Sequence, residues 1–206
     1  MLKTTLTALA LSVTALSASA DETLPWQHAL SLYGDIKYEE GFTHFDYVNP
    51  NAPRGGILRQ GVQGTFETFN SFSNTRDSAA AGVGLLYDSL LRTSSDESMT
   101  GYGLLASRMK MAEDRSFVIY EIREEARWHD GEPITAHDVV FTFNYLLSSH
   151  APPGYASYYG AIDSIEATSE RTVKFTFKEG SAREMPISVG TQSILPSHYW
   201  EACVAK

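Results

Sequence analysis

Five residues whose side chains can do chemistry lie close together in the sequence: His129, Asp130, Glu132, His137 and Asp138. Imidazole nitrogens and carboxylate oxygens are common metal ligands, so a metal site is the first possibility to consider. The two histidines are separated by a turn and by Pro133, so this spacing does not place both on one face of a helix. The sequence therefore predicts structural roles for these residues and no metal site.

The elements around these residues account for the two aspartates. Asp130-Gly131 is a turn pair, because glycine reaches positive φ without a Cβ clash. Thr135 is a good N-cap, and Asp138, three residues later, completes a capping box. A helix is predicted from there, with one apolar stripe made of Val139, Val140, Phe143, Leu146 and Leu147.

Other candidates for catalysis are weaker. Glu124 and Glu125 are adjacent in an extended segment, so they point to opposite sides and do not form a pair of acids across a cleft. The sequence has no Gly-x-Ser-x-Gly elbow, and Cys203 has no partnering context. Gly82-Val83-Gly84 lacks the context of a phosphate loop. We predict a protein that is not an enzyme, with no catalytic residue, metal or cofactor.

The amino end has the three parts of an export signal. Lys3 is basic, residues 6–16 are mostly apolar, and Ala18-Ser19-Ala20 is a small-residue cleavage site. Cleavage after Ala20 predicts a periplasmic protein. The residue directly after the cleavage site is Asp21 and not a cysteine, so we predict that the protein carries no lipid anchor. No apolar stretch approaches the roughly 18 residues that a membrane span needs.

Composition narrows the class of partner. The chain has 206 residues, of which 43% are hydrophobic and 20% charged, which is ordinary for a globular protein. Its formal charge is −9, or −10 once Lys3 is removed with the signal, and this argues against nucleic acid or an anionic membrane as a partner. Cys203 is the only cysteine, so no intramolecular disulfide forms.

Along the rest of the chain the pattern predicts mixed helices and strands. Residues 21–56 form an extended arm attached by its aromatic side chains, with a possible short helix over residues 26–33. A strand is expected at 57–63, a helix at 79–91 with Leu85, Leu86, Leu90 and Leu91 inward, and a loop at 93–103. Two hairpins follow, over residues 109–123 and 162–177. Tyr155, Tyr158 and Tyr159 fall in a predicted loop, 183–189 in a short helix, and the last helix begins near Pro196 with nothing to pack against.

The segment from Trp128 to Phe141 carries a family resemblance. Together with Leu105-Ala106, the turn at Asp114 and the strand from Phe117 to Arg123, it resembles the signature of family 5 of the extracellular solute-binding proteins, the peptide- and nickel-binding class of ABC importers. Residues 32–34 and 44–56 are similar to the Yej-type branch, which is associated with oligopeptide and microcin C uptake. The resemblance covers residues 24–201.

The resemblance implies an α/β fold with mixed sheets, forming the amino-terminal part of a two-lobe binding protein. After the signal at 1–20 and the arm at 21–56, residues 57–72 would form the first-lobe strand segment. Residues 73–206 would form an extra small domain, truncated before the chain returns to lobe one, so that the second lobe is missing. The implied partners are an oligopeptide and the permease subunits in the inner membrane, with the chain itself a monomer.

By the same resemblance, four consecutive residues contact the ligand: Asn74, Thr75, Arg76 and Asp77. The physical logic is β-augmentation, in which main-chain groups bind peptides of any sequence; a plain surface loop is the alternative at each position. Trp128, Asp130, Gly131 and Asp138 are implied to be scaffold. A standalone secreted peptide-interaction module, without a role in transport, is the second hypothesis for the whole chain.

Overall fold

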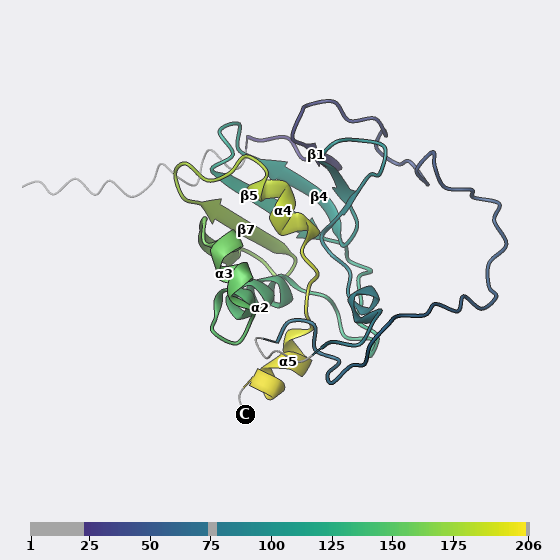
Figure 1. The fold of residues 1–206 in the computed structure, drawn as a ribbon. Coiled ribbons are helices and arrows are strands. Elements are labelled where there is room, and N and C mark those ends of the chain that lie inside the picture. The colour runs from purple at the N-terminus through teal and green to yellow at the C-terminus, as the bar shows by residue number, and fades with distance from the viewer. Residues whose placement is uncertain (1–22, 74–77, 205–206) are drawn as a thin grey trace, which may run out of the picture.

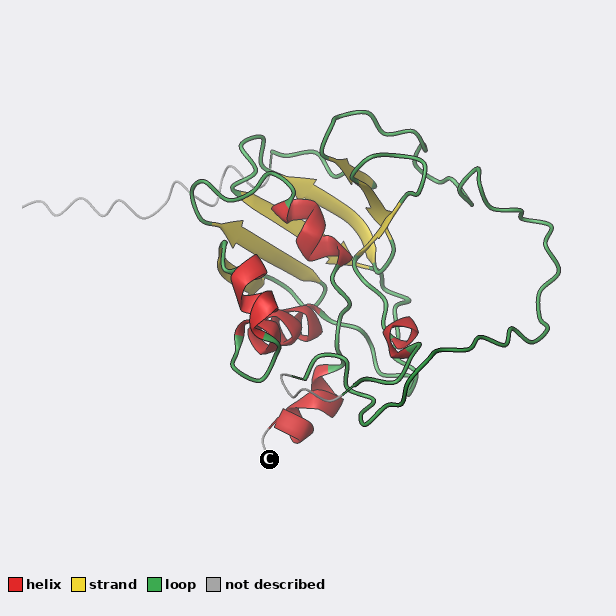
Figure 2. Cartoon of the chain, in the orientation of Figure 1, coloured by secondary structure: helices red, strands yellow, loops and turns green. Residues whose placement is uncertain are grey.

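Two antiparallel sheets form the frame of the protein in a computed structural model that describes residues 23–73 and 78–204 (Figures 1 and 2). The export signal predicted at 1–20 lies outside the described residues. The larger sheet has the order β4 (Ala106–Met111), β5 (Phe117–Ile122), β7 (Thr172–Phe177) and β6 (Ile162–Ala167). The smaller sheet has the order β1 (Ala29–Ser31), β3 (Thr100–Gly103) and β2 (Leu91–Thr93). The predicted mixture of helices and strands is confirmed.

Both predicted hairpins are present in the larger sheet. β4 pairs with β5, β6 pairs with β7, and β5 joins the two hairpins by pairing with β7. In β7 the side chains alternate as predicted, because Val173, Phe175 and Phe177 are buried while Thr172, Lys174 and Thr176 are partly exposed.

Helix α2 (Ala136–Leu147) covers the β6–β7 side of this sheet. Its inward stripe is centred on Phe143, which is fully buried and makes edge-on ring contacts with Phe175, at 4.9 Å between ring centroids, and with Tyr159, at 5.2 Å. The other helical elements are η1 (Val83–Leu86), α3 (Pro153–Tyr159), α4 (Met185–Thr191) and α5 (Ser197–Val204). None of the helices in the described ranges is long and apolar enough to cross a membrane.

Two predicted elements are not formed. Residues 57–63 pair with no strand in the described part of the chain; Ile57 is 83% exposed and Leu58 84%. The β-propensity of such a run depends on packing against a neighbouring strand, and none of the described strands pairs with it. The helix predicted at 79–91 shrinks to the 3-10 turn η1, because Gly82 adopts a left-handed conformation with φ 85°. Leu85, expected inward, is 89% exposed.

Long-range packing overturns four further predictions. The segment 26–33 contains strand β1 instead of a helix, and the predicted loop at 93–103 contains β3, which pairs with β1 and β2. The three tyrosines at 155, 158 and 159 lie on helix α3 instead of in a loop. The last helix, α5, does have packing partners, because Trp200 is buried against Tyr145 and Phe72. The short helix predicted at 183–189 is α4, shifted by two residues.

The arm is held by its aromatic side chains, as predicted. Tyr38 is buried and packs against Phe42, Phe45 and Tyr102 with ring centroids 5.1 to 5.6 Å apart. Tyr102 lies on β3, so the cluster attaches the arm to the smaller sheet. A hydrogen bond adds to this ring packing, because the main-chain N–H of Tyr38 donates to the Tyr102 hydroxyl at 3.1 Å.

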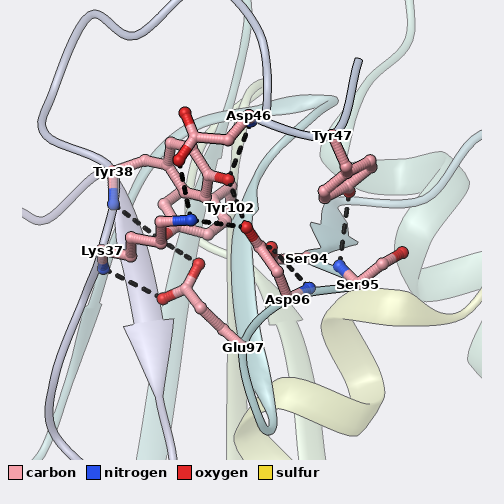
Figure 3. Close-up of polar contacts among 9 residues, drawn as sticks. All are labelled: Lys37, Tyr38, Asp46, Tyr47, Ser94, Ser95, Asp96, Glu97 and Tyr102. Atoms are coloured by element: carbon pink, nitrogen blue, oxygen red, sulfur yellow. Dashed lines mark hydrogen bonds and ion pairs between the residues drawn. The ribbon is translucent and has the colours of Figure 1, made fainter.

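Charged groups reinforce this attachment (Figure 3). The Nζ atom of Lys37 lies 2.7 Å from Asp46 Oδ2 and 2.6 Å from Asp96 Oδ2, and so joins the arm to the turn between β2 and β3. The Tyr38 hydroxyl donates to the same Asp96 oxygen at 2.6 Å. The Lys37 ammonium, followed by the Ser94 and Tyr38 hydroxyls, holds the pKa of Asp96 well below its ordinary value.

This attachment is expected to weaken in acid. Because the pKa of Asp96 is lowered in the folded state, its stabilisation is present above the unfolded value of about 3.9 and is lost as the pH falls through the folded value. Urea unfolding followed from pH 7 to pH 2 should show stability falling below about pH 5. Asp96→Asn should unfold more easily at pH 7 and show a shallower decline. Asp163→Asn, on an exposed β6 position, is the matched control; an unchanged slope in Asp96→Asn would contradict the assignment.

Candidate functional site

The segment predicted to contact ligand, Asn74 to Asp77, lies outside the described residues, but both of its flanks are described. They are closed on each other by main-chain hydrogen bonds: the N–H of Glu67 donates to the Ser78 carbonyl at 2.9 Å, and the N–H of Ala80 donates to the Thr68 carbonyl at 2.8 Å. The Glu67 carboxylate also accepts the N–H of Ser78 at 3.0 Å. These bonds therefore join residues 67 and 68 to residues 78 and 80, on the two sides of the segment.

Phe72 fixes the amino-terminal flank to the body of the protein. Its ring is buried, with centroids 6.2 Å from Tyr87 and 6.3 Å from Trp200, and its carbonyl accepts the Tyr145 hydroxyl at 3.2 Å. The flank thereby contacts α2 and α5. The indole Nε1 of Trp200 is buried and has no hydrogen-bond partner within the described part of the chain. A buried donor of this kind costs about 1–3 kcal/mol when it is left unpaired.

The signature segment is organised by the carboxylate of Asp138, which is only 2% exposed. Its Oδ2 atom accepts the main-chain N–H of Thr135 at 2.8 Å and the indole N–H of Trp128 at 3.4 Å. Its Oδ1 atom accepts both the N–H and the hydroxyl of Ser197, each at 2.8 Å. The predicted capping box is confirmed, and the same side chain also attaches the start of α5.

The remaining polar residues of the signature point to separate partners. Gly131 has φ 94°, which confirms the predicted turn, and the N–H of Glu132 donates to Asp130 Oδ1 at 3.2 Å. His198 Nε2 lies 2.7 Å from Asp130 Oδ2 and lowers the pKa of that carboxyl. His137 instead faces α5, with Nδ1 3.3 Å from Ser197 Oγ. Within residues 23–73 and 78–204, no three His, Cys, Asp or Glu side chains gather as metal ligands would.

A hollow of about 260 Å³ opens between η1, the turn after Trp128 and α5. Its walls are mainly apolar and aromatic, and its lining includes Leu86, Tyr87, Trp128, Asp130, His198 and Tyr199. Sequence reasoning missed it because these residues come from three separate segments. The exposure of Leu86 could not be foreseen, since its spacing fits an inward helical position.

The two antiparallel sheets, with α2 packed on the larger sheet and α5 packed on α2, are similar to parts of solved structures of one class of protein, the solute-binding proteins. The AppA oligopeptide-binding protein of Bacillus subtilis, solved with a nonapeptide, matches with a TM-score of 0.54 and 27% identity over 67% of this chain and 27% of its own. A Thermotoga maritima protein, described as a periplasmic oligopeptide-binding protein with bound mannohexaose, matches with a TM-score of 0.50 and 31% identity over 60% of this chain and 23% of its own.

Residues 101–204 match the family model described as bacterial extracellular solute-binding proteins, family 5 middle, and the chain belongs to this family. The match begins in β3 and includes the whole signature segment. It confirms the family resemblance that the sequence indicates.

Similar curated proteins agree with this assignment. The chain is 40% identical to the probable peptide-binding protein YejA of Agrobacterium fabrum over 89% of this chain and 30% of that protein. It is 38% identical to the peptidoglycan-binding protein YepA of the same species over 83% of this chain and 29% of that protein. The chain therefore spans about 30% of the length of these relatives.

Proposed function

We propose that this chain is part of the periplasmic substrate-binding component of an ABC importer for oligopeptides. The observation that carries the proposal is the family match across residues 101–204, together with a relative 40% identical that is named a probable peptide-binding protein. In this proposal the protein is exported with its signal cleaved after Ala20. It binds the peptide as a monomer and passes it to permease subunits in the inner membrane.

The segment Asn74, Thr75, Arg76 and Asp77 is proposed to contact the main chain of the peptide. The fixed flanks support this proposal, because the bonds between Glu67 and Ser78 and the burial of Phe72 leave the segment between two anchored points. In this proposal the main chain of the segment pairs with an extended peptide without selecting its side chains. The binding energy then comes from main-chain groups that every oligopeptide offers.

In this proposal the chain supplies only one face of the cleft that holds the peptide, and this sets an expected result. A binding site must cover most of a ligand's surface to hold it tightly. Calorimetric titration of the purified chain with mixed-sequence nonapeptides should therefore give no micromolar binding. A clear micromolar affinity would instead favour the alternative, a standalone secreted peptide-interaction module.

A chimera provides the positive test. Residues 23–204 would replace the matching segment of the Agrobacterium fabrum relative, which supplies the rest of a longer protein. We expect the chimera to bind nonapeptides in the micromolar range or better, and mannohexaose far more weakly. The intact relative is the control for ligand quality. A chimera that folds with the melting temperature of the relative and still binds no peptide would refute the proposed function.

A further inference from the structure

We propose that two copies of this chain exchange their amino-terminal segments, residues 23–32, so that the segment of each copy pairs with the sheets of the other. The exchanged dimer uses the contacts that hold the segment in the monomer. The inference goes beyond the proposed function and does not rest on it, because it uses no ligand contact. The closed monomer remains the form that the proposed function describes.

The amino-terminal segment closes one edge of each sheet. Strand β4 ends the larger sheet, and there Gln27 and Met109 exchange both main-chain hydrogen bonds, at 2.7 and 2.8 Å. Two residues later β1 ends the smaller sheet by pairing with β3, beside β4 (Figure 1). Without the segment, main-chain groups of β3 and β4 would lie open at these edges. An open strand edge recruits another strand.

Side chains strengthen the pairing on β4. The Trp26 ring contacts two cations, with Arg108 Cζ 4.5 Å and Lys110 Nζ 4.9 Å from the ring centroid. Arg108 and Lys110 are two residues apart on β4, so they share one face of the strand. The indole ring attracts both cations through its π face. These contacts, like the main-chain pairing, are the same whichever copy supplies the segment.

The charges of β4 select the segment of a second copy over a second β4. An antiparallel pair of β4 strands centred on Met109 would place Arg108 of each copy directly opposite Lys110 of the other. Like charges in that position destabilise a sheet. The Trp26 side chain instead brings no charge and supplies an aromatic face to both cations. The partner that fits the open edge is therefore the amino-terminal segment of a second copy.

A hinge of four residues, 33–36, separates the segment from the rest of the arm. Before the hinge, the N–H of Leu32 donates to the Met99 carbonyl at 3.1 Å. After the hinge, the N–H of Lys37 donates to Glu97 Oε1 at 3.0 Å. The segment can therefore leave its own sheets while the arm stays attached to them.

Gly34 gives the hinge its bend. Its φ is 99°, a left-handed value that favours glycine, and its neighbour Tyr33 is 70% exposed. A segment that pairs with another copy leaves its own sheets, so its hinge straightens, and four extended residues span about 13 Å. All other contacts re-form between the two copies. The balance between monomer and exchanged dimer is therefore set by the hinge.

The first test changes the hinge alone in the full chain. Gly34→Val makes the bent hinge costly, and we expect the dimerisation constant, which involves two hinges, to rise about tenfold or more. Gly64→Val is the matched control and should not change it, because Gly64 also has a positive φ, 114°, and an added Cβ meets nothing within 4 Å at either glycine. Analytical ultracentrifugation up to millimolar concentration measures both variants. A Gly34→Val chain that stays monomeric, or an equal rise in Gly64→Val, would overturn the inference.

Cross-linking shows which surfaces meet in the dimer. The pairing of Gln27 with Met109 places residue 26 opposite residue 110, where the Cα atoms of such a pair lie about 4.5 Å apart, a separation that a disulfide spans. One chain would carry Trp26→Cys and another Lys110→Cys, both with Cys203→Ser. Mixed at millimolar concentration, they should form a mixed disulfide dimer.

A chain that carries both new cysteines is the control for the cross-link. Oxidised at low concentration, it should close on itself and no longer dimerise, and reduction should restore dimerisation. Equal dimerisation of the oxidised and reduced forms would show that another surface associates, and would refute the exchange.

Trp26→Ala separates exchange from simple pairing of open edges. The Trp26 contacts are present in both the monomer and the exchanged dimer, so the dimerisation constant should stay within about twofold of the parent. The rate at which labelled copies mix should rise about two- to tenfold, because the segment detaches more easily. Tyr199→Ala, at an exposed aromatic residue of α5, should change neither quantity. A tenfold rise in dimer in Trp26→Ala would show that β4 edges pair with each other, and would overturn the inference.

Discussion

Asp138→Ala is expected to lower the free energy of unfolding by about 3–5 kcal/mol. The substitution leaves buried donors of Thr135, Trp128 and Ser197 without an acceptor, and each unpaired buried donor costs about 1–3 kcal/mol. It also removes the cap of α2 and the attachment of α5 together. Urea unfolding followed by tryptophan fluorescence measures the change.

Two matched variants make this result specific. Asp163→Ala removes an exposed carboxylate from β6 and should stay within about 0.5 kcal/mol of the parent. Asp138→Asn keeps one acceptor oxygen and should be intermediate. A loss below about 1 kcal/mol in Asp138→Ala would show that other groups replace the carboxylate, and would contradict its central place in the signature.

Phe143→Ala is expected to cost a similar amount, about 3–5 kcal/mol, through a different mechanism. The ring is fully buried between Phe175 of β7 and Tyr159 of α3, so its removal leaves a cavity where helix meets sheet. The neighbours belong to paired strands and a packed helix and relax only partly into such a cavity. Thermal unfolding, with calorimetric and van't Hoff enthalpies compared, measures the loss.

Phe69→Ala is the matched control, because Phe69 is 69% exposed and loses little burial on truncation. We expect a change within about 0.5 kcal/mol there. If Phe143→Ala lost no more than Phe69→Ala, then α2 would not be packed on the larger sheet as the structure has it.

The sequence predicts well those elements whose partners are close in the chain. The capping box joins Thr135 and Asp138, three residues apart, and each hairpin joins neighbouring strands. Propensity, turn chemistry and periodicity all act over these distances, so they agree with the final structure. The identity of the family also depends on this local region.

Most of the predictions that fail depend on partners far along the chain, although the helix predicted at 79–91 fails locally, at Gly82. β1 becomes a strand because residues 29–31 meet residues 100–102, and β3 is built on Gly101 and Gly103, which carry no strand signal. A Cβ on Gly101 would lie 2.9 Å from a methyl of Leu91, so a larger residue there would make the Leu91 side chain shift. Conversely, residues 57–63 have the pattern of a strand and no partner among the described strands.

The candidate site also has one part that the sequence predicts and one part that it does not. The segment at 74–77 comes from the family resemblance and stays a prediction. The hollow could not be foreseen, because Leu86, Trp128 and Tyr199 come together only after η1 and α5 pack beside the signature turn. No periodicity connects three residues in separate segments, so only the fold reveals that they share a wall.

The two oxygens of Asp138 belong to different stages of folding. The partners of Oδ2 lie three and ten residues away, so their contacts close small loops and form quickly. The partner of Oδ1, Ser197, lies 59 residues away, and we expect that contact to form later, because it closes a loop that contains the second hairpin and α4. Until α5 arrives, Oδ1 remains hydrated and the apolar hollow lacks one wall. One carboxylate thus belongs to an early local structure through one oxygen and to a late, long-range structure through the other.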